Sequence, residues 1–305
     1  MNAPTRLAAF GLGLVAVFGV ALGVGRLAGP VAAGPAAGAG AGHSAAGSGA
    51  GPGPSGSAAG VPGGLQVSER GYTLQLASPT APAGPGTLAF RVLGPDQRPV
   101  TAYEVTHERE LHLIVVQRDL SDYRHLHPIR DAAGTWRAPV RLRPGAYRVF
   151  ADFQAAGAPE ALTLGADLAV PGSATPVPLP QPAPASRVGG YTVTLDGDLT
   201  PGATSRLSFA VTAAGRPVTD LQPYLGAAGH LVALRAGDLA YLHVHPAAGG
   251  LAFDAEVPSP GPYRLFLEFR HRGVVRTAEF TAVAGAGAAP PARAPGGGHD
   301  DGHGD

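Results

Sequence analysis

The sequence predicts an all-β chain with two tandem β-sandwich domains that follow one apolar N-terminal segment. Three observations predict this class. Two segments repeat each other block by block, apolar and polar residues alternate within the blocks, and neither segment contains a long stretch with a period of 3.6 residues. Alternation is typical of a half-buried strand, and blocks that recur in the same order indicate a duplicated domain.

The first 26 residues are expected to form a transmembrane anchor or a signal peptide. Residues 7–25 carry no charge, and as a helix they would extend about 28 Å, close to the thickness of a bilayer core. This length favours an uncleaved anchor, whereas the small residues at 31–33 favour cleavage by a signal peptidase. Either alternative places the rest of the chain on the extracytoplasmic face of the cell membrane or in the secreted fraction.

Changes of composition divide the rest of the chain. Residues 27–64 consist almost entirely of Gly, Ala, Pro and Ser, and we expect a flexible tether there. Residues 172–188 are rich in Pro and are expected to form a stiffer linker. Residues 285–305 end in a His- and Asp-containing tail that is expected to be disordered. These limits leave residues 65–171 for the first domain and 189–284 for the second.

The repeat between the domains is clearest in two blocks. Tyr147 and Tyr263 each follow Pro-Gly-x, and His125 and His243 each begin His-x-His-Pro. Turn residues separate the alternating runs about every 8–12 residues, which predicts several short strands per copy. Such a set is typical of an immunoglobulin-like sandwich, and a tyrosine after Pro-Gly is compatible with the tyrosine corner of that fold.

Composition excludes several classes of function. The chain has 22 Lys+Arg and 22 Asp+Glu, so it has no basic surplus for nucleic-acid binding. Its Gly-rich stretches follow no strand-to-helix pattern, so no nucleotide site is expected. It has no Cys, which excludes thiolate nucleophiles and cysteine-ligated metals. We expect no enzyme, and any metal would be held by His, carboxylates, backbone or water.

Six of the 11 His residues stand at matched positions in the two copies: His112, His125 and His127 in the first, and His230, His243 and His245 in the second. In both copies the first precedes the second by 13 residues, and the third follows two residues later. Residues i and i+2 of a strand project from one face, so we expect the three imidazoles of each copy to converge. Imidazole suits copper and zinc ions, so a Cu(II) or Zn(II) site in each copy is predicted. Histidines that pack or cap backbone groups without metal remain the alternative.

Four further side chains are candidates for an additional shell around the metal: His107, Glu110, Asp152 and Glu268. Because His107 and Glu110 precede only the first copy's cluster, we expect the first domain to bind metal more tightly. His299 and His303 in the tail are expected to form a weak site. His271, outside the repeated pattern, is expected at an exposed hairpin tip.

The block HLIVVQRDLSDYRHLHP from His112, followed by PGAYRVFADF from Pro144, resembles a group of uncharacterised exported bacterial proteins with tandem immunoglobulin-like domains. Members are sometimes assigned to heavy-metal-binding or copper-associated domains. The resemblance extends from about Gly71 to Ala284, and it implies an extracytoplasmic module concerned with metal homeostasis. It implies no established activity.

Two functions follow. The first is an extracytoplasmic Cu(II)- or Zn(II)-binding protein of metal homeostasis that uses the repeated His clusters and is attached to the membrane by its N-terminal helix. The alternative is a non-catalytic structural or protein-interaction module of the cell envelope. Its contact with an envelope partner would use a sheet edge or an exposed apolar patch.

Overall fold

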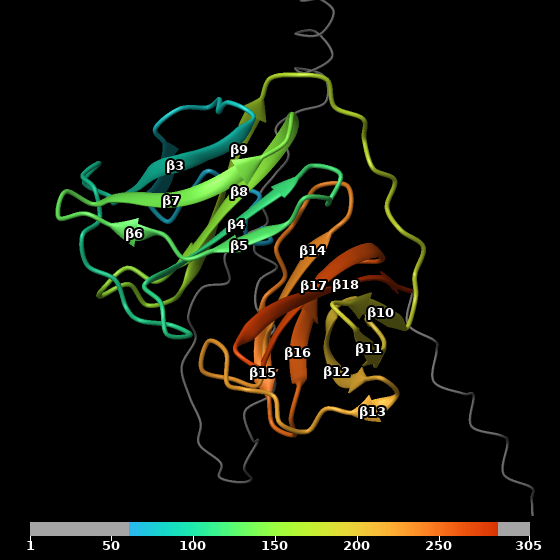
Figure 1. Ribbon diagram of the computed structural model, residues 1–305. Helices are drawn as coiled ribbons and strands as arrows, with labels where there is room; N and C mark the ends of the chain where they lie inside the picture. Colours follow the sequence, from blue (N-terminus) through green and yellow to red (C-terminus); the bar gives the residue numbers. More distant parts are fainter. Residues whose placement is uncertain (1–60, 286–305) are drawn as a thin grey trace, which may run out of the picture. The chain divides into compact units, whose positions relative to one another are not determined.

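The computed structural model describes residues 61–285, and all of its regular elements are strands (Figure 1). The all-β prediction is therefore confirmed for this range. The expected N-terminal helix, most of the tether and the His-containing tail lie outside it. Among the residues described, none forms a helix long and apolar enough to cross a membrane.

The first sandwich contains strands β1 (Ser68–Glu69), β2 (Tyr72–Leu76), β3 (Gly84–Leu93), β4 (Leu111–Gln117), β5 (Arg124–Leu126), β6 (Ile129–Arg130), β7 (Thr135–Leu142), β8 (Gly145–Phe153) and β9 (Leu162–Val170). One sheet has the order β1-β2-β3-β7-β6, and the other has the order β5-β4-β8-β9. Neighbouring strands in both sheets are antiparallel.

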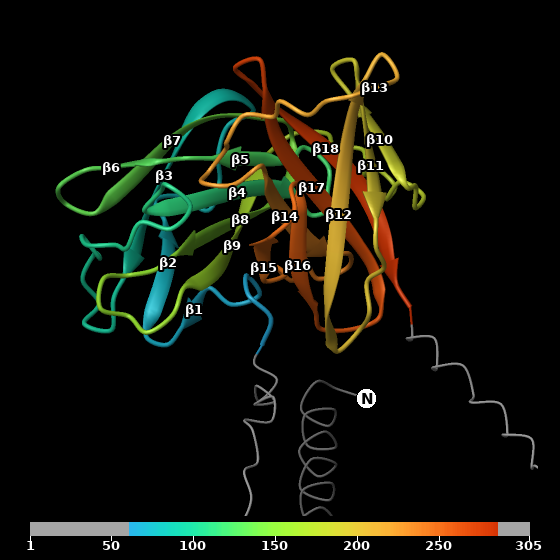
Figure 2. The same ribbon diagram turned by 90° about the horizontal axis from the view of Figure 1, so that it is seen from below.

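The second sandwich contains strands β10 (Ala185–Val188), β11 (Tyr191–Asp196), β12 (Ala203–Ala213), β13 (Arg216–Pro217), β14 (His230–Arg235), β15 (Val244–Ala247), β16 (Ala252–Val257), β17 (Gly261–His271) and β18 (Val274–Ala284). Its sheets have the orders β10-β11-β12-β16-β15, with β13 beside β12, and β14-β17-β18. The long hairpin of β17 and β18 is visible in Figure 2.

Both copies have the same topology in their long strands. The first, second and fourth long strands of each copy form one sheet, β2-β3-β7 and β11-β12-β16. The third, fifth and sixth form the other, β4-β8-β9 and β14-β17-β18. This partition of strands between two sheets is that of an immunoglobulin-like sandwich.

The tyrosine corner is present in both copies. The Tyr147 hydroxyl donates to the backbone carbonyl of Arg143 at 3.1 Å, and the Tyr263 hydroxyl donates to that of Ser259 at 2.8 Å. Each bond reaches back four residues from the tyrosine. The intervening Pro-Gly leads the chain into the strand. The expectation drawn from the Pro-Gly-x-Tyr block is confirmed.

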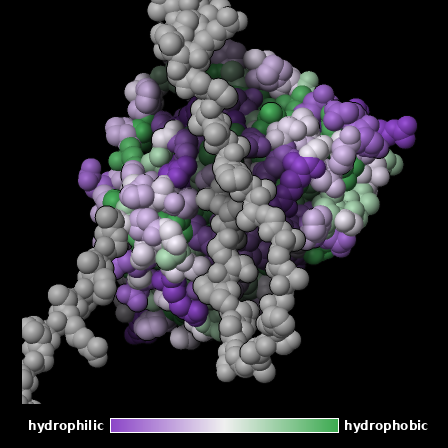
Figure 3. All heavy atoms as spheres, turned by 180° about the vertical axis from the view of Figure 1, so that it is seen from behind, coloured by the Kyte–Doolittle hydropathy of each residue, from purple (hydrophilic) through white to green (hydrophobic). Residues whose placement is uncertain are grey.

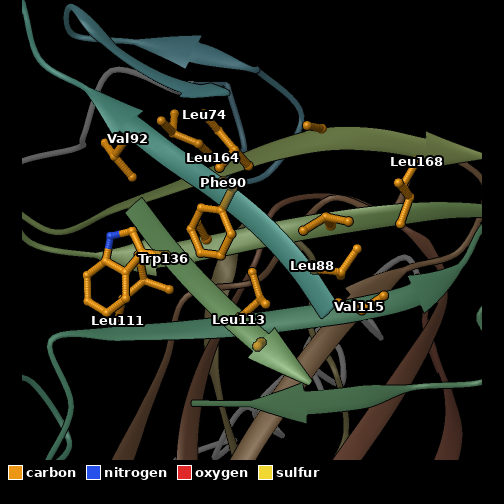
Figure 4. Close-up of a cluster of buried hydrophobic side chains, with 14 of the residues drawn as sticks. Leu74, Leu88, Phe90, Val92, Leu111, Leu113, Val115, Trp136, Leu164 and Leu168 are labelled. Atoms are coloured by element: carbon orange, nitrogen blue, oxygen red, sulfur yellow. The ribbon is translucent and has the colours of Figure 1, made fainter. Parts of the chain in front are cut away.

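Each sandwich has its own apolar core, formed by the alternate residues of the strands that face inward. In the first copy, Phe90 on β3 and Trp136 on β7 are directly opposite in register, and their rings lie 6.4 Å apart. Figure 4 shows the labelled side chains of both sheets pointing toward one another. Burial of one such side chain contributes about 1.5–3 kcal/mol.

A third apolar cluster joins the two copies, and we call it the shared cluster. Its buried members are Ile114, Val116, Leu120 and Phe150 from the first copy, and Val232, Leu234, Leu239 and Phe266 from the second. Each residue of the first copy has its repeat equivalent in the cluster, at offsets of 118, 118, 119 and 116 residues by subtraction. The duplicated domains therefore meet through the same outer face of the same sheet, as the subunits of a twofold dimer do.

Two predicted boundaries need correction. β10 pairs with β11, so residues 185–188 belong to the second sandwich rather than to the linker. At the end of the predicted tether, the N–H of Gly64 donates to the Thr163 carbonyl, and the N–H of Tyr241 donates to the Gly63 carbonyl. Hydrogen bonds of this kind tie these residues into the folded unit, which spans both sandwiches.

Candidate metal centre

Three histidines of the first copy come together at one end of the shared cluster. His112 lies on β4, His125 on β5, and His127 follows β5 directly. β5 pairs with β4 and places His125 opposite Ile114, so His125 shares the outer face of the sheet with His112. One atom from each of the three imidazoles lies within 4.8 Å of the others.

The spacing of these rings suits a single ion. The ring centroids of His112 and His125 are 5.2 Å apart, those of His112 and His127 are 5.4 Å apart, and those of His125 and His127 are 4.8 Å apart. Imidazoles that share one tetrahedral zinc ion, at bonds of about 2.0–2.1 Å, have centroids roughly 5 Å apart. The three rings are thus spaced as ligands of one ion would be.

The second copy contributes His230 to the same place. His230 begins β14, and its ring lies 4.9 Å from that of His125 and 5.4 Å from that of His112, nearly parallel to the latter. His107 extends the group, with its ring 6.0 Å from that of His112 and 5.7 Å from that of His230. We call these five residues the histidine cluster.

A chain of hydrogen bonds crosses the histidine cluster. His112 Nε2 lies 3.2 Å from the Thr106 carbonyl oxygen, His112 Nδ1 lies 3.0 Å from His125 Nε2, and His125 Nδ1 lies 2.6 Å from the Glu268 carboxyl. A carbonyl can only accept, so His112 donates from Nε2 and accepts at Nδ1. His125 then donates from Nε2, and its Nδ1 accepts a hydrogen bond from the Glu268 carboxyl. The chain is complete with neutral imidazoles and a protonated carboxyl.

Burial favours these neutral forms. Burial, with a smaller contribution from neighbouring histidines, lowers the pKa of both His125 and His127 to about 3. Burial likewise lowers the pKa of His112 and His230. For Glu268, burial raises the pKa to about 8, opposed by Tyr224 and His112. A neutral imidazole is the form that ligates metal, so the site needs no deprotonation of its rings.

Two ring nitrogens in the cluster lack partners. Nε2 of His127 and Nε2 of His230 are buried, and neither has a hydrogen-bond partner among residues 61–285. An unsatisfied buried polar group costs about 1–3 kcal/mol. A cation held between the rings would give these nitrogens the partner that they lack.

The carboxylates that the sequence suggested for an additional shell have different partners. Glu268 contacts His125 directly, as described above. Asp152 lies opposite His112 in the β4–β8 register and accepts a hydrogen bond from the Thr163 hydroxyl at 2.9 Å. Glu110 instead forms an ion pair with Arg130 at 3.2 Å, so its carboxylate is not a partner of the histidines.

His243 and His245 do not join His230. Both are exposed, and their rings lie 4.1 Å apart. The reason is a change of sheet: β5 pairs with β4, beside His112, whereas β15 pairs with β16 in the opposite sheet and carries His245 to a position across from Asp254. Among the described residues, the expected second cluster of three imidazoles is therefore not assembled.

His271 is buried rather than exposed, which corrects its expected place at a hairpin tip. It is 4% exposed at the end of β17, where Nδ1 lies 2.7 Å from the Tyr191 hydroxyl and Nε2 lies 3.1 Å from Asp220. The tip itself is formed by the residues that follow. His299 and His303 lie outside the described residues.

The chain belongs to a family described as "Domain of unknown function (DUF8832)", whose pattern matches twice, at residues 66–168 and 186–286. The two matches confirm the tandem repeat. The family's description names no metal, so the expected kinship with heavy-metal-binding or copper-associated domains stays a prediction. No curated protein matches the chain in sequence.

Solved structures similar to this chain include surface and extracellular proteins. The Escherichia coli adhesin FdeC is 15% identical, with 72% of this chain and 65% of that chain covered and a TM-score of 0.22. Yersinia pseudotuberculosis InvD is 13% identical, with 75% and 61% covered and a TM-score of 0.23. Extracellular domains 3–5 of Drosophila OTK are 13% identical, with 73% and 69% covered and a TM-score of 0.19. The alignments span less than two thirds of FdeC and of InvD, and at these TM-scores the likenesses carry no argument about function.

Proposed function

We propose that this protein is a non-catalytic, extracytoplasmic pair of immunoglobulin-like domains that binds Cu(II) or Zn(II) in its histidine cluster. The observation that carries the proposal is the convergence of His112, His125 and His127, whose rings are spaced as the ligands of one ion. Imidazole is a ligand of borderline softness that suits both ions.

Burial supports binding rather than catalysis. A catalytic zinc site keeps an open coordination position that substrate can reach. Here His112 is 1% exposed, and the side chain of His125 is fully buried. A role in holding or delivering an ion fits this enclosure better than turnover of a substrate does.

The test is a calorimetric titration of the full-length protein with Zn(II) and with Cu(II). We expect a Kd below about 10 μM, equivalent to about −7 kcal/mol. His127→Ala should abolish this binding, whereas His243→Ala, which removes an exposed histidine of the repeated pattern, should not. If neither ion binds, or if His127→Ala binds as wild type does, the proposal is wrong.

A purely structural or interaction role in the cell envelope is the second candidate, and the shared cluster favours it. Eight buried apolar side chains fasten the copies to each other, so the pair would act as one rigid spacer or display unit. On the face in Figure 3, hydrophilic and hydrophobic residues interleave, and the exposed large apolar residues of the described part are Val and Ile only.

The two candidates differ in one measurable respect. A spacer needs the domain contact but no metal, so its thermal unfolding would be the same with Zn(II), with Cu(II) and with a chelator. A metal-binding protein would unfold at a higher temperature with the ion present, because a ligand of the native state stabilises that state.

A further inference from the structure

We propose that the metal site is shared between the two copies of the domain, with His230 of the second copy as a ligand alongside His112, His125 and His127 of the first. This inference rests on the proposed metal-binding function and deepens it. The chain would then hold a single ion that bridges the two domains, rather than one ion in each domain.

The first argument is the position of the His230 ring. Its centroid lies 4.9 Å from that of His125 and 5.4 Å from that of His112. These two distances fall within the range of 4.8 to 5.4 Å found among the three rings of the first copy. The His230 ring is therefore as close to the rings of His112 and His125 as the first copy's own rings are to one another.

The second argument is the unpartnered nitrogen. Nε2 of His230 is buried without a hydrogen-bond partner in the described range, and the same holds for Nε2 of His127. Two orphaned imidazole nitrogens at one buried place, each from a different copy, would both be satisfied by one cation between them.

The third argument is the carboxyl that crosses the interface. Glu268 of the second copy lies 2.6 Å from Nδ1 of His125 in the first, and both side chains are almost fully buried. Metal-ligating histidines commonly donate their second N–H to a carboxylate, which orients the ring and strengthens it as a ligand. Glu268 stands where such a partner of a metal-bound His125 would be.

The shared cluster explains why the site can form. It packs β4 and β8 of the first copy against β14 and β17 of the second. His112 directly precedes this apolar stretch on β4, and His230 does so on β14. The packing that buries Ile114 and Val232 in one cluster therefore also brings the rings of the two histidines within 5.4 Å of each other, before any metal is bound.

The experiment uses the full-length chain and three single variants: His127→Ala, His230→Ala and, as the matched control from the same copy, His243→Ala. Zn(II) affinity is measured by calorimetry. Co(II) serves as a spectroscopic probe, because its visible spectrum reports the number and geometry of its ligands. Thermal unfolding in a chelator checks that each variant is folded.

We expect His230→Ala to weaken Zn(II) binding at least about 10-fold and to change the Co(II) spectrum, while His243→Ala matches wild type in both. The rise in unfolding temperature with Zn(II) should shrink in parallel. If His230→Ala binds Zn(II) and Co(II) as wild type does while His127→Ala does not, the shared site is wrong and the metal-binding function stands. If wild type takes up neither ion, both are wrong.

A second variant keeps the test decisive if His230→Ala fails to fold. His230→Gln retains a polar side chain of similar length, but the amide is a poor ligand for these ions. It should have the native unfolding temperature in chelator and lack most of the Zn(II)-dependent rise. A full Zn(II)-dependent rise in His230→Gln would overturn the proposal.

Discussion

The Glu268 carboxyl of the second domain and Nδ1 of His125 in the first domain lie 2.6 Å apart, although the two residues are separated by 143 positions in the sequence. This contact ends a hydrogen-bonded chain that begins at the Thr106 carbonyl and passes through His112. Burial lowers the pKa of His112 and His125, and with both rings neutral the direction of each bond in that chain follows from the carbonyl, which can only accept. In the metal-free protein, Glu268 is therefore a donor.

This directionality predicts different outcomes for two substitutions of Glu268. Glu268→Gln retains a donor for His125 Nδ1, so the free energy of unfolding without metal should stay within about 1 kcal/mol of wild type. Glu268→Ala leaves that nitrogen unsatisfied and should cost about 1–3 kcal/mol. Denaturant titrations in a chelator measure both. Equal losses for the two variants would contradict the assigned direction of the bond.

The same pair of variants separates stability from metal binding. The Gln side chain cannot act as the carboxylate partner of a metal-bound His125. We therefore expect Glu268→Gln to bind Zn(II) about 10–100-fold more weakly than wild type, despite its native stability. Calorimetry at constant pH provides the comparison, and wild-type affinity in Glu268→Gln would rule out a role for the carboxylate.

The shared cluster predicts that the two domains unfold together. Phe266 is fully buried in it, and its ring stacks on Tyr123 at 3.9 Å. Phe266→Ala should cost about 3–5 kcal/mol and divide one calorimetric transition into two. Val274, 52% exposed, is the control, because Val274→Ala should change stability by less than about 0.5 kcal/mol. Two transitions already present in wild type would show that the domains are independent.

The tyrosine corners offer a matched pair within one chain. The Tyr147 hydroxyl donates to the Arg143 carbonyl or to Asp122, and accepts from Gln117 and from the Arg143 N–H. The Tyr263 hydroxyl has the Ser259 carbonyl as its short contact, at 2.8 Å. We expect Tyr147→Phe to cost about 1–3 kcal/mol, because it removes more hydrogen bonds, and Tyr263→Phe about 0.5–1.5 kcal/mol. The reverse order in denaturant titrations would contradict this reasoning.

The buried histidines predict that the metal-free protein loses stability in acid. His125 and His127 have a pKa of about 3 in the folded protein against 6.5 when unfolded, so the unfolded chain binds more protons between these limits. Stability therefore falls as pH decreases from about 6.5 toward 3. Glu268, raised from 4.5 to about 8, acts in the opposite sense between those two values.

The histidines outnumber this one carboxyl, since the pKa of His112 and that of His230 are also lowered. We therefore expect the urea midpoint in a chelator to fall from pH 6.5 to pH 4.5. A midpoint that rises as pH decreases below 6.5 would show that the imidazoles are charged in the native state.

The sequence was sufficient to predict the parts of this fold that depend on local pattern. Alternation predicted the strands, and Pro-Gly-x-Tyr predicted the tyrosine corners. The contact between the copies was missed, although the run from Leu111 to Val116 carried a signal for it. Apart from His112, that run is apolar on both faces, and so are residues 231–234 of β14, which indicates strands that are buried on both sides. A repeat analysis treats each copy alone, so it assigned His230 to its own domain.

The same limit applies to the second half of the repeated motif. His125 and His243 occupy equivalent positions in the sequence, yet one is buried in the cluster and the other is exposed. The difference is whether the short strand pairs with its neighbour in the same sheet or with the opposite sheet. Identical spacing of the histidines could not reveal this choice.

The pairing of β15 with β16 predicts the stoichiometry of metal binding. This pairing places His243 and His245 in the other sheet from His230 and leaves both exposed. Exposed histidines contribute little to the affinity for an ion. We expect one tightly bound Zn(II) per chain by calorimetry and by native mass spectrometry. The double variant His243→Ala/His245→Ala should change neither the stoichiometry nor the Kd by more than about twofold, which is about 0.4 kcal/mol. Two tightly bound ions per chain, one of them lost in the double variant, would restore the expectation of a separate site in each domain.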